Sequence, residues 1–209
     1  MNRSEATRQR WDRTALFFDL MAGFGPEKRW FPFKRELFAR MTGKVLFLAV
    51  GTGLDIPAFP PGLEIVGIDI SPAMLEKART RAERYPGKMT LQVMDAGAMT
   101  FADRSFDQVF TSCTFCSVPD PAEGLRSIRR VLKPGGWLRM FEHTGSDVFP
   151  FGSLLNFMNP LCRHIGPEMN RDTVARVREA GFRIHRVNHL YLDVVKTIEA
   201  CLPAEGGER

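Results

Sequence analysis

The sequence predicts an α/β protein with one doubly wound sheet of about seven strands, mostly parallel, that closes with an antiparallel strand. Short apolar runs rich in β-formers recur along the chain, with helical segments between them. The first run, residues 45–50, breaks at a Gly-x-Gly pair. Two final runs, residues 182–187 and 190–198, predict an antiparallel pair. A length of 209 residues with 44% apolar content fits a single domain.

The Gly-x-Gly pair, Gly51 and Gly53, predicts a tight turn where the backbone approaches a ligand closely, because glycine has no Cβ. Such a pair alone also fits an ordinary turn. The next apolar run, residues 64–69, ends in Asp69, where a carboxylate would hold a ribose. A third glycine would favour a dinucleotide, but residues 54–56 contain none. The sequence therefore favours a nucleoside ligand without phosphates over NAD.

Five motifs then follow one another in order: Val45–Gly53, Val66–Leu75, Asp95-Ala96, Ser105–Asp107 and Arg130–Gly136. Five further segments complete the pattern: Lys34–Phe38, Phe59–Gly62, Cys116–Val118, Glu142-His143 and Asn170–Thr173. The ordered series resembles class I S-adenosylmethionine (SAM)-dependent methyltransferases, and the combination is more specific than any single motif. The further segments are most similar to the alkyl-thiol methyltransferase-like family. The general pattern also resembles small bacterial phosphatidylethanolamine N-methyltransferases and quinone-biosynthesis methyltransferases. This resemblance implies a Rossmann-like fold and SAM as cofactor.

Two positions depart from that family pattern. Phe47 stands where the family usually has an acid, and Ala49 stands where it has the first glycine. The acid normally lies near the methionine end of SAM, so its loss changes that contact. Ala49 is a milder change, because a methyl group still fits the turn.

The resemblance also assigns ligand contacts. Asp95, after a third strand predicted at 89–94, would accept from the adenine amino group; the alternative is an Asx-type turn cap. Met74, in a helix predicted over 72–84 with Ser71 as N-cap, would touch the adenine or fill the core. The cofactor-binding residues implied are Ala49, Gly51, Gly53, Asp69, Ile70, Met74, Asp95, Ala96 and Ser112.

Two more strands are predicted at 106–111 and 137–143, joined by a helix over 121–132. Because ligands gather at the carboxyl ends of parallel strands, loop 112–118 should line the site between cofactor and acceptor. Residues 144–170 show no regular spacing of apolar residues, and their apolar content suits a lid over an apolar acceptor. The expected organisation is one domain with a helical cap or membrane-facing arm (1–44), a SAM-binding core (45–143), a lid-like insertion (144–170) and closing helix and strands (171–202).

The candidate catalytic residues are His143, Glu142 and Asp19. A methyl sulfonium already carries a good leaving group, so the protein mainly aligns the reactants and excludes water. A general base is needed only when the acceptor arrives protonated. Imidazole exchanges protons near neutral pH, so His143 is the candidate base, with a structural histidine as the alternative. Glu142 or Asp19 would orient His143 or balance a cationic acceptor.

Residues 1–44, the N-terminal arm, hold the whole basic excess of the chain, ten Lys/Arg against five Asp/Glu. The arm also has eight of the 22 aromatic residues. This composition predicts a helical cap over the active site, an amphipathic helix on an anionic membrane, or, more weakly, a nucleic-acid surface. No nucleic-acid motif occurs, so no such partner is expected. No apolar run reaches the roughly 18 to 20 residues that span a bilayer, so any membrane contact is peripheral, at the inner face.

The four cysteines are irregularly spaced and no secretory signal precedes them, which indicates a reduced, cytoplasmic protein. Cys113 and Cys116 form a Cys-x-x-Cys pair, but no second ligand pair accompanies it, so no metal site is predicted. Two small apolar fillers are the favoured interpretation.

The function predicted is methyl transfer from SAM to a small apolar or lipid-like acceptor, such as a phospholipid amine, a thiol or a quinone precursor. Two alternatives belong to other classes. Phe47 and Ala49 motivate a SAM-binding module without catalysis, and the glycine turn leaves room for a nicotinamide-dependent oxidoreductase. The sequence leaves the methylated atom and the oligomeric state open.

Overall fold

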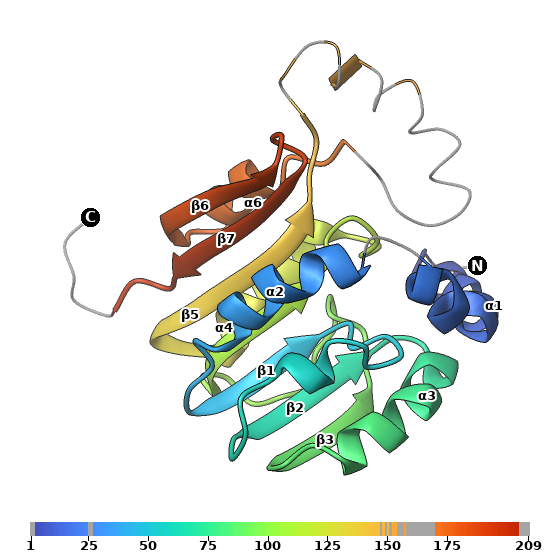
Figure 1. The fold of residues 1–209 in the computed structure, drawn as a ribbon. Coiled ribbons are helices and arrows are strands. Elements are labelled where there is room, and N and C mark those ends of the chain that lie inside the picture. The colour runs from blue at the N-terminus through green and yellow to red at the C-terminus, as the bar shows by residue number, and fades with distance from the viewer. Residues whose placement is uncertain are drawn as a thin grey trace.

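Seven strands form one mixed sheet with helices on both faces (Figure 1). The computed structural model describes residues 3–24, 27–146, 148, 150, 152, 153, 157 and 170–204. The strand order is β3-β2-β1-β4-β5-β7-β6, in which β7 is antiparallel to both of its neighbours and the other pairs are parallel. This confirms the predicted fold class. The strands are β1 (Lys44–Leu48), β2 (Glu64–Asp69), β3 (Lys88–Val93), β4 (Phe106–Ser112), β5 (Leu132–His143), β6 (Arg183–Tyr191) and β7 (Val195–Cys201).

The helices divide between the N-terminal arm and the sheet crossovers. In Figure 1, α2 crosses in front of the sheet, and α1 stands beside α3 at one end of it. The N-terminal arm is therefore helical, as predicted. The helices are α1 (Arg3–Phe24), α2 (Glu27–Phe38), the short 3-10 helix η1 (Ile56–Ala58), α3 (Pro72–Glu83), α4 (Pro121–Val131) and α6 (Thr173–Glu179).

Strand β1 lies inside the sheet, between β2 and β4, and is buried on both faces. Its alternate residues Leu46 and Leu48 pack in a cluster with α4 and α6 residues, whereas Val45 and Phe47 pack in a second cluster with α2 and α3 residues. Because successive side chains of a strand point to opposite faces, one continuous apolar run supplies both cores.

Phe47 belongs to the core and not to a ligand site. It is 1% exposed, and its ring centroid lies 5.5 Å from that of Phe38 and 4.8 Å from that of Phe59. Aromatic rings at these separations attract one another beyond simple burial. The position that holds an acid in the family pattern is therefore an aromatic packing position here.

Side-chain caps begin three helices, and the cap at Ser71 is the one that the sequence analysis names. The hydroxyl of Ser71 accepts from the amide of Met74 at 3.1 Å, and the carboxylate of Asp172 accepts from the amide of Ala175 at 2.9 Å. Asp120 caps α4 in the same way. Each cap satisfies an amide that has no partner within its helix.

The predicted break in the closing pair is wrong. The sequence places the turn at residues 188 and 189, but β6 continues to Tyr191 and the turn follows at Leu192, with φ +48°. Asn188 forms part of the ladder, because its side-chain amide donates to the Thr197 hydroxyl at 3.1 Å. The polar pair Asn188-His189 thus lies within a strand that exposes one face.

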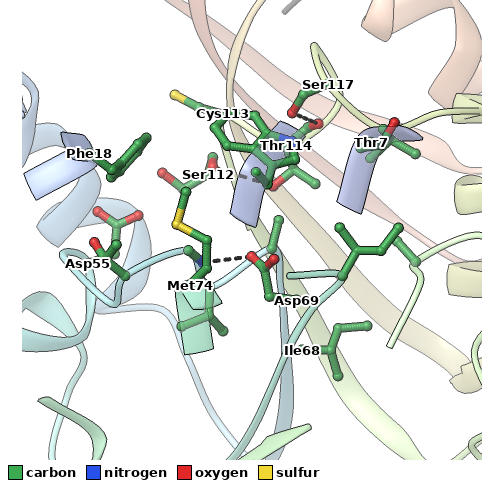
Figure 2. Close-up of a pocket in the computed structure, with 18 of the residues that line it drawn as sticks. Thr7, Phe18, Asp55, Ile68, Asp69, Met74, Ser112, Cys113, Thr114 and Ser117 are labelled. Carbon is green, nitrogen blue, oxygen red and sulfur yellow. Dashed lines mark hydrogen bonds between the residues drawn. The ribbon is translucent and has the colours of Figure 1, made fainter. Parts of the chain in front are cut away.

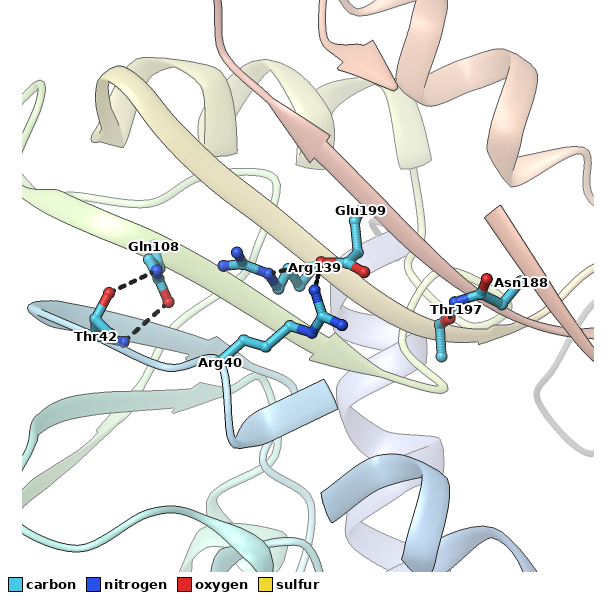
Figure 3. Close-up of polar contacts among 7 residues, drawn as sticks. All are labelled: Arg40, Thr42, Gln108, Arg139, Asn188, Thr197 and Glu199. Atoms are coloured by element: carbon cyan, nitrogen blue, oxygen red, sulfur yellow. Dashed lines mark hydrogen bonds and ion pairs between the residues drawn. The ribbon is translucent and has the colours of Figure 1, made fainter. Parts of the chain in front are cut away.

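Ion pairs join the end of α2 to the closing strands (Figure 3). Glu199 on β7 accepts from Arg139 on β5 at 3.1 Å and from Arg40, just beyond α2, at 3.2 Å. Next to this group, the side chain of Gln108 on β4 bonds with the amide and hydroxyl of Thr42. These contacts fix the chain that leads from the N-terminal arm into β1. Most of the predicted lid, 144–170, lies outside the described residues.

Replacing Phe47 with Ala should lower the free energy of unfolding by about 3–5 kcal/mol, because the change removes a fully buried ring and leaves a cavity. Urea denaturation followed by circular dichroism measures this. Phe17, which is 61% exposed, is the control, and Phe17→Ala should change stability by less than about 0.5 kcal/mol. A loss below about 1 kcal/mol for Phe47→Ala would contradict the packed position.

Candidate functional site

A cavity of about 140 Å³ opens at the carboxyl ends of β1, β2, β3 and β4 (Figure 2). In a doubly wound sheet this edge is where ligands bind. Of the nine residues that the sequence resemblance assigns to the cofactor, only Gly53 does not line the cavity. The eight that line it are Ala49, Gly51, Asp69, Ile70, Met74, Asp95, Ala96 and Ser112.

The two glycines of the turn have different tasks. Gly51 has φ +58°, and a Cβ added there would meet nothing within 4 Å, so its backbone faces open space in the cavity. Gly53 has φ +84°, and a Cβ there would come within 2.8 Å of Ile56 Cδ1 and 3.2 Å of Ala78 Cβ. Gly51 therefore leaves room for a ligand, whereas Gly53 lets α3 pack closely against the turn.

Asp69, the last residue of β2, is held by backbone amides. Its Oδ2 accepts from the amide of Gly51 at 2.8 Å, and its Oδ1 accepts from the amide of Ser71 at 2.9 Å. Burial raises the pKa of Asp69 to about 6, although these hydrogen bonds favour the carboxylate. The side chain is 7% exposed and lines the cavity, so its remaining lone pairs are placed to accept from ligand hydroxyls.

Two further polar side chains reach the cavity. Asp95 lines it and also accepts from the amide of Gly97 at 2.8 Å, so the turn cap and the cavity position occur together. The buried hydroxyl of Ser112 has no hydrogen-bond partner within the described part of the chain. A buried polar group without a partner is costly, and a polar ligand atom in the cavity would remove that cost.

The cover of the cavity comes from the N-terminal arm. Thr7, Trp11 and Phe18 reach it from α1, and Lys34 reaches it from α2. Sequence reasoning anticipated a cap with inward aromatic residues but assigned no lining role to Thr7, Trp11 or Lys34. The signal available was the density of aromatic residues in the arm.

Polar contacts hold α1 against α3. Asp12 accepts from the Ser71 hydroxyl at 2.5 Å and from the amide of Ala73 at 3.4 Å. Asp19 pairs with Arg81 at 3.0 Å, and Arg81 also donates to the carbonyl of Thr52. Asp19, one of the candidate catalytic residues, does not line the cavity. In this structure its ion pair with Arg81 holds α1 against α3.

Comparison with known proteins follows this geometry. Residues 46–140 match a family model described as a methyltransferase domain. The ubiquinone/menaquinone biosynthesis C-methyltransferase UbiE of Geotalea daltonii is 32% identical over 166 residues, which span 74% of this chain and 70% of that protein. The chain belongs to the class I SAM-dependent methyltransferases. SAM is its cofactor, and membership of this family decides against the nicotinamide-dependent alternative.

Other relatives of this methyltransferase carry different names. Human thiol S-methyltransferase TMT1B is 32% identical over 174 residues, covering 71% of this chain and 67% of that protein. The phosphatidylethanolamine N-methyltransferase of Cereibacter sphaeroides is 34% identical over 129 residues, covering 58% and 63%. Among solved structures, a SAM-dependent methyltransferase from Methanosarcina mazei aligns with a TM-score of 0.60 at 20% identity, covering 81% of this chain and 97% of that one. At 20% identity, this structural similarity shows that the two proteins share a fold.

The residues present fit SAM. The open space at Gly51, the carboxylate of Asp69 and the unpaired hydroxyl of Ser112 suit a polar nucleoside, and Trp11 and Phe18 offer aromatic surface. When bound, SAM supplies an activated methyl group. The methyltransferase itself positions the reactants and keeps water away from them.

Glu142 is fully buried and does not line the cavity. Its carboxylate accepts from the Thr111 hydroxyl at 2.7 Å and from the amides of Thr114 and Phe115 at 3.2 and 3.0 Å. Burial raises the pKa of Glu142 to about 7 against the effect of these hydrogen bonds. Arg171 donates to the carbonyls of Phe115 and Val118 and so holds the same loop. In this arrangement Glu142 shapes the loop after β4.

His143 does not line the cavity. Its Nδ1 is 3.4 Å from the Sγ of Cys113, which does line the cavity. Cys113 has φ +52°, a left-handed backbone conformation that is uncommon for a residue with a side chain. The sequence predicts that His143 faces the cleft from a strand end, but in the structure His143 is outside the cavity lining and contacts Cys113, which lines the cavity.

Cys116 is buried, and burial, followed by the nearby Glu142 carboxylate, raises the pKa of its thiol to about 12. The thiol therefore stays protonated at neutral pH. Among the described residues, no group of three or more His, Cys, Asp or Glu side chains could hold a metal ion. None of the described helices is long and apolar enough to cross a membrane.

Affinity for S-adenosylhomocysteine (SAH), the demethylated cofactor, should fall as pH drops through about 6. Because burial raises the pKa of Asp69 to about 6, the carboxylate predicted to accept from ribose hydroxyls is lost below that pH. If only the ionised form binds, affinity at pH 5 should be about tenfold weaker than at pH 8. Isothermal titration calorimetry across this range measures the effect.

Asp69→Asn is the matched control for this pH profile. Glu142 also titrates, near pH 7, so the profile that belongs to Asp69 is the difference between wild type and this variant. The variant should bind SAH more weakly and should lack the decline centred near pH 6. The same decline in both proteins would show that Asp69 does not accept from the ligand.

Proposed function

We propose that this methyltransferase acts on a small, apolar or amphipathic acceptor that meets the cofactor beneath α1. The observation that carries the proposal is the cavity cover. Its ring side chains Trp11 and Phe18 line the same cavity as the polar residues assigned to the cofactor. Apolar walls with a few placed polar groups are typical of sites for small apolar ligands.

The relatives support this class of acceptor and leave its reacting atom open. Their names specify a quinone-pathway carbon, a thiol sulfur and a phospholipid amine, at similar identities of 32 to 34%. These acceptors are small molecules or lipids. We therefore propose a phospholipid amine, a thiol or a quinone precursor as the substrate.

His143 is proposed as the general base when the acceptor arrives protonated. The imidazole lies 3.4 Å from the Cys113 thiol, and that thiol borders the cavity. A proton leaving the acceptor at this wall would reach His143 through the Cys113 thiol, which the imidazole contacts. Glu142 precedes His143 on β5 and accepts hydrogen bonds from the loop that carries Cys113.

Transfer of labelled methyl from SAM to a panel of thiols, phospholipid vesicles and quinone precursors tests the function. Label should appear in one class of acceptor. With that acceptor, His143→Ala should lower kcat by about 100-fold or more while leaving the Kd for SAM unchanged, because removal of a general base affects only the chemical step.

His189→Ala is the control for the loss of a histidine, because His189 is exposed on β6. It should retain wild-type turnover. Near-full activity of His143→Ala would remove the base role. SAM binding with no label in any acceptor would contradict the proposed acceptor class.

A peripheral contact with an anionic membrane surface is the second part of the proposal. The apolar side chains Leu16, Phe17 and Leu20 on α1 are 71%, 61% and 62% exposed. At 3.6 residues per turn they share one sector of about 140° with three arginines. We call this set the outer face of α1: Leu16, Phe17, Leu20, Arg3, Arg10 and Arg13.

The charges on α1 are segregated. The acids have partners away from the outer face: Asp12 and Asp19 bond to α3, and Glu5 pairs with Arg8 at 2.7 Å. Arg10 and Arg13 form no ion pair within the part of the chain that the structure describes. Exposed apolar side chains beside unpaired arginines are typical of helices that lie at an anionic bilayer surface.

Vesicle cosedimentation tests this contact. Wild type should bind vesicles of phosphatidylglycerol and phosphatidylcholine better than vesicles of phosphatidylcholine alone. Arg10→Gln with Arg13→Gln should weaken binding about 20- to 30-fold, because each arginine near an anionic surface contributes about 1 kcal/mol. Exposed Arg176 and Arg178 on α6 are the charge-matched control. Equal loss when they are replaced with Gln would show a response to net charge alone and would contradict the outer face.

A further inference from the structure

Lys34 and Asp55 form an ion pair on the wall of the cavity. Lys34 Nζ lies 3.1 Å from Asp55 Oδ1, with side-chain exposures of 3% and 14%. Both residues line the cavity. Among the described lining residues the other charged side chains are Asp69 and Asp95, so Lys34 is the one cation on this wall.

The pair is built from two distant segments. Lys34 belongs to α2, and its ammonium lies 5.3 Å above the centroid of the Phe141 ring. Asp55 follows the glycine turn after β1, next to η1. In Figure 2, Asp55 and Asp69 lie on opposite sides of Met74. The pair therefore occupies a part of the cavity separate from the carboxylate suited to the ribose.

A buried ion pair is a weak source of stability, because removing two charges from water costs about as much as their attraction returns. Such a pair beside open space has a clearer use as a ligand contact. The amino-acid end of SAM carries an ammonium and a carboxylate, and Lys34 and Asp55 present the complementary charges. Charge-assisted hydrogen bonds of this kind are roughly twice as strong as neutral ones.

The usual acid of the family is absent from this chain. Phe47 occupies its position and is buried against Phe38 and Phe59, so it offers nothing to a charged ligand. We propose that Lys34 and Asp55 bind the amino-acid end of the cofactor in its place, Lys34 at the carboxylate and Asp55 at the ammonium. This inference deepens the proposed function and rests on the cofactor cavity described there.

Binding of three related ligands separates this role from a structural one. SAH has both charged groups, decarboxylated SAH lacks the carboxylate, and methylthioadenosine lacks the whole amino-acid end. By calorimetry, Lys34→Met should weaken SAH binding about 10- to 100-fold, as expected for loss of one hydrogen bond between charged groups. It should leave the affinities for decarboxylated SAH and methylthioadenosine within about twofold of wild type.

Asp55→Asn should weaken both SAH and decarboxylated SAH relative to methylthioadenosine, because both retain the ammonium. Lys133→Met is the control variant. It removes a similar lysine–aspartate pair, Lys133 with Asp107 at 2.7 Å, whose members are 47% and 37% exposed and do not line the cavity. This variant should bind all three ligands as wild type does.

Two outcomes would overturn the inference. Equal weakening of all three ligands by Lys34→Met would show that the pair only anchors α2 to the glycine turn. Wild-type binding of methylthioadenosine as tight as that of SAH would show that the amino-acid end is not recognised. If the wild type bound neither SAH nor methylthioadenosine, the cofactor cavity itself would be rejected. Failure of this inference and failure of the proposed function are therefore distinguishable.

Discussion

The fixed carboxylate of Asp69 is the interaction on which the site depends. It accepts from the backbone at Gly51 and at Ser71, and so joins the turn after β1, the end of β2 and the start of α3. The Ser71 hydroxyl caps α3 and also donates to Asp12 on α1. One network therefore connects the N-terminal helix to the residue suited to a ribose. Burial raises the pKa of Asp69. The two amide hydrogen bonds nevertheless keep its side chain in one orientation.

The N-terminal arm gives the fold its particular character. A doubly wound sheet presents an open edge at its strand ends, and here α1 and α2 cover that edge with Trp11, Phe18 and Lys34. Helix α1 has three different sectors: one at the cavity, one against α3 and one exposed. A single helix thus contributes to the fold, to the ligand site and to the surface, and these demands explain why its apolar residues do not form one stripe.

The sequence predicts the sheet well, because buried strands and capped helices have local signals. The run from Val45 to Leu48 and the caps Ser71, Asp120 and Asp172 are examples. The positions around the cavity of the residues assigned to the cofactor follow from the order of these strands and turns.

What could not be predicted depends on contacts between distant segments. Nothing near Lys34 in the sequence indicates that Asp55 is its partner, and nothing near His143 indicates that it contacts Cys113. The closing pair was misplaced because Asn188, a common turn residue, bonds across the ladder to Thr197.

The attachment of α1 has a consequence for turnover. Among the contacts that hold the helix to α3 is the ion pair of Asp19 with Arg81, whose side chains are about one-third exposed. Contacts of this kind are weak and are screened by salt, unlike the buried aromatic packing of Phe47 against Phe38 and Phe59. Opening of α1 is therefore a low-energy motion compared with unfolding of the sheet. Because α1 covers part of the cavity, cofactor exchange that requires this opening should become faster as ionic strength rises, while the sheet stays folded.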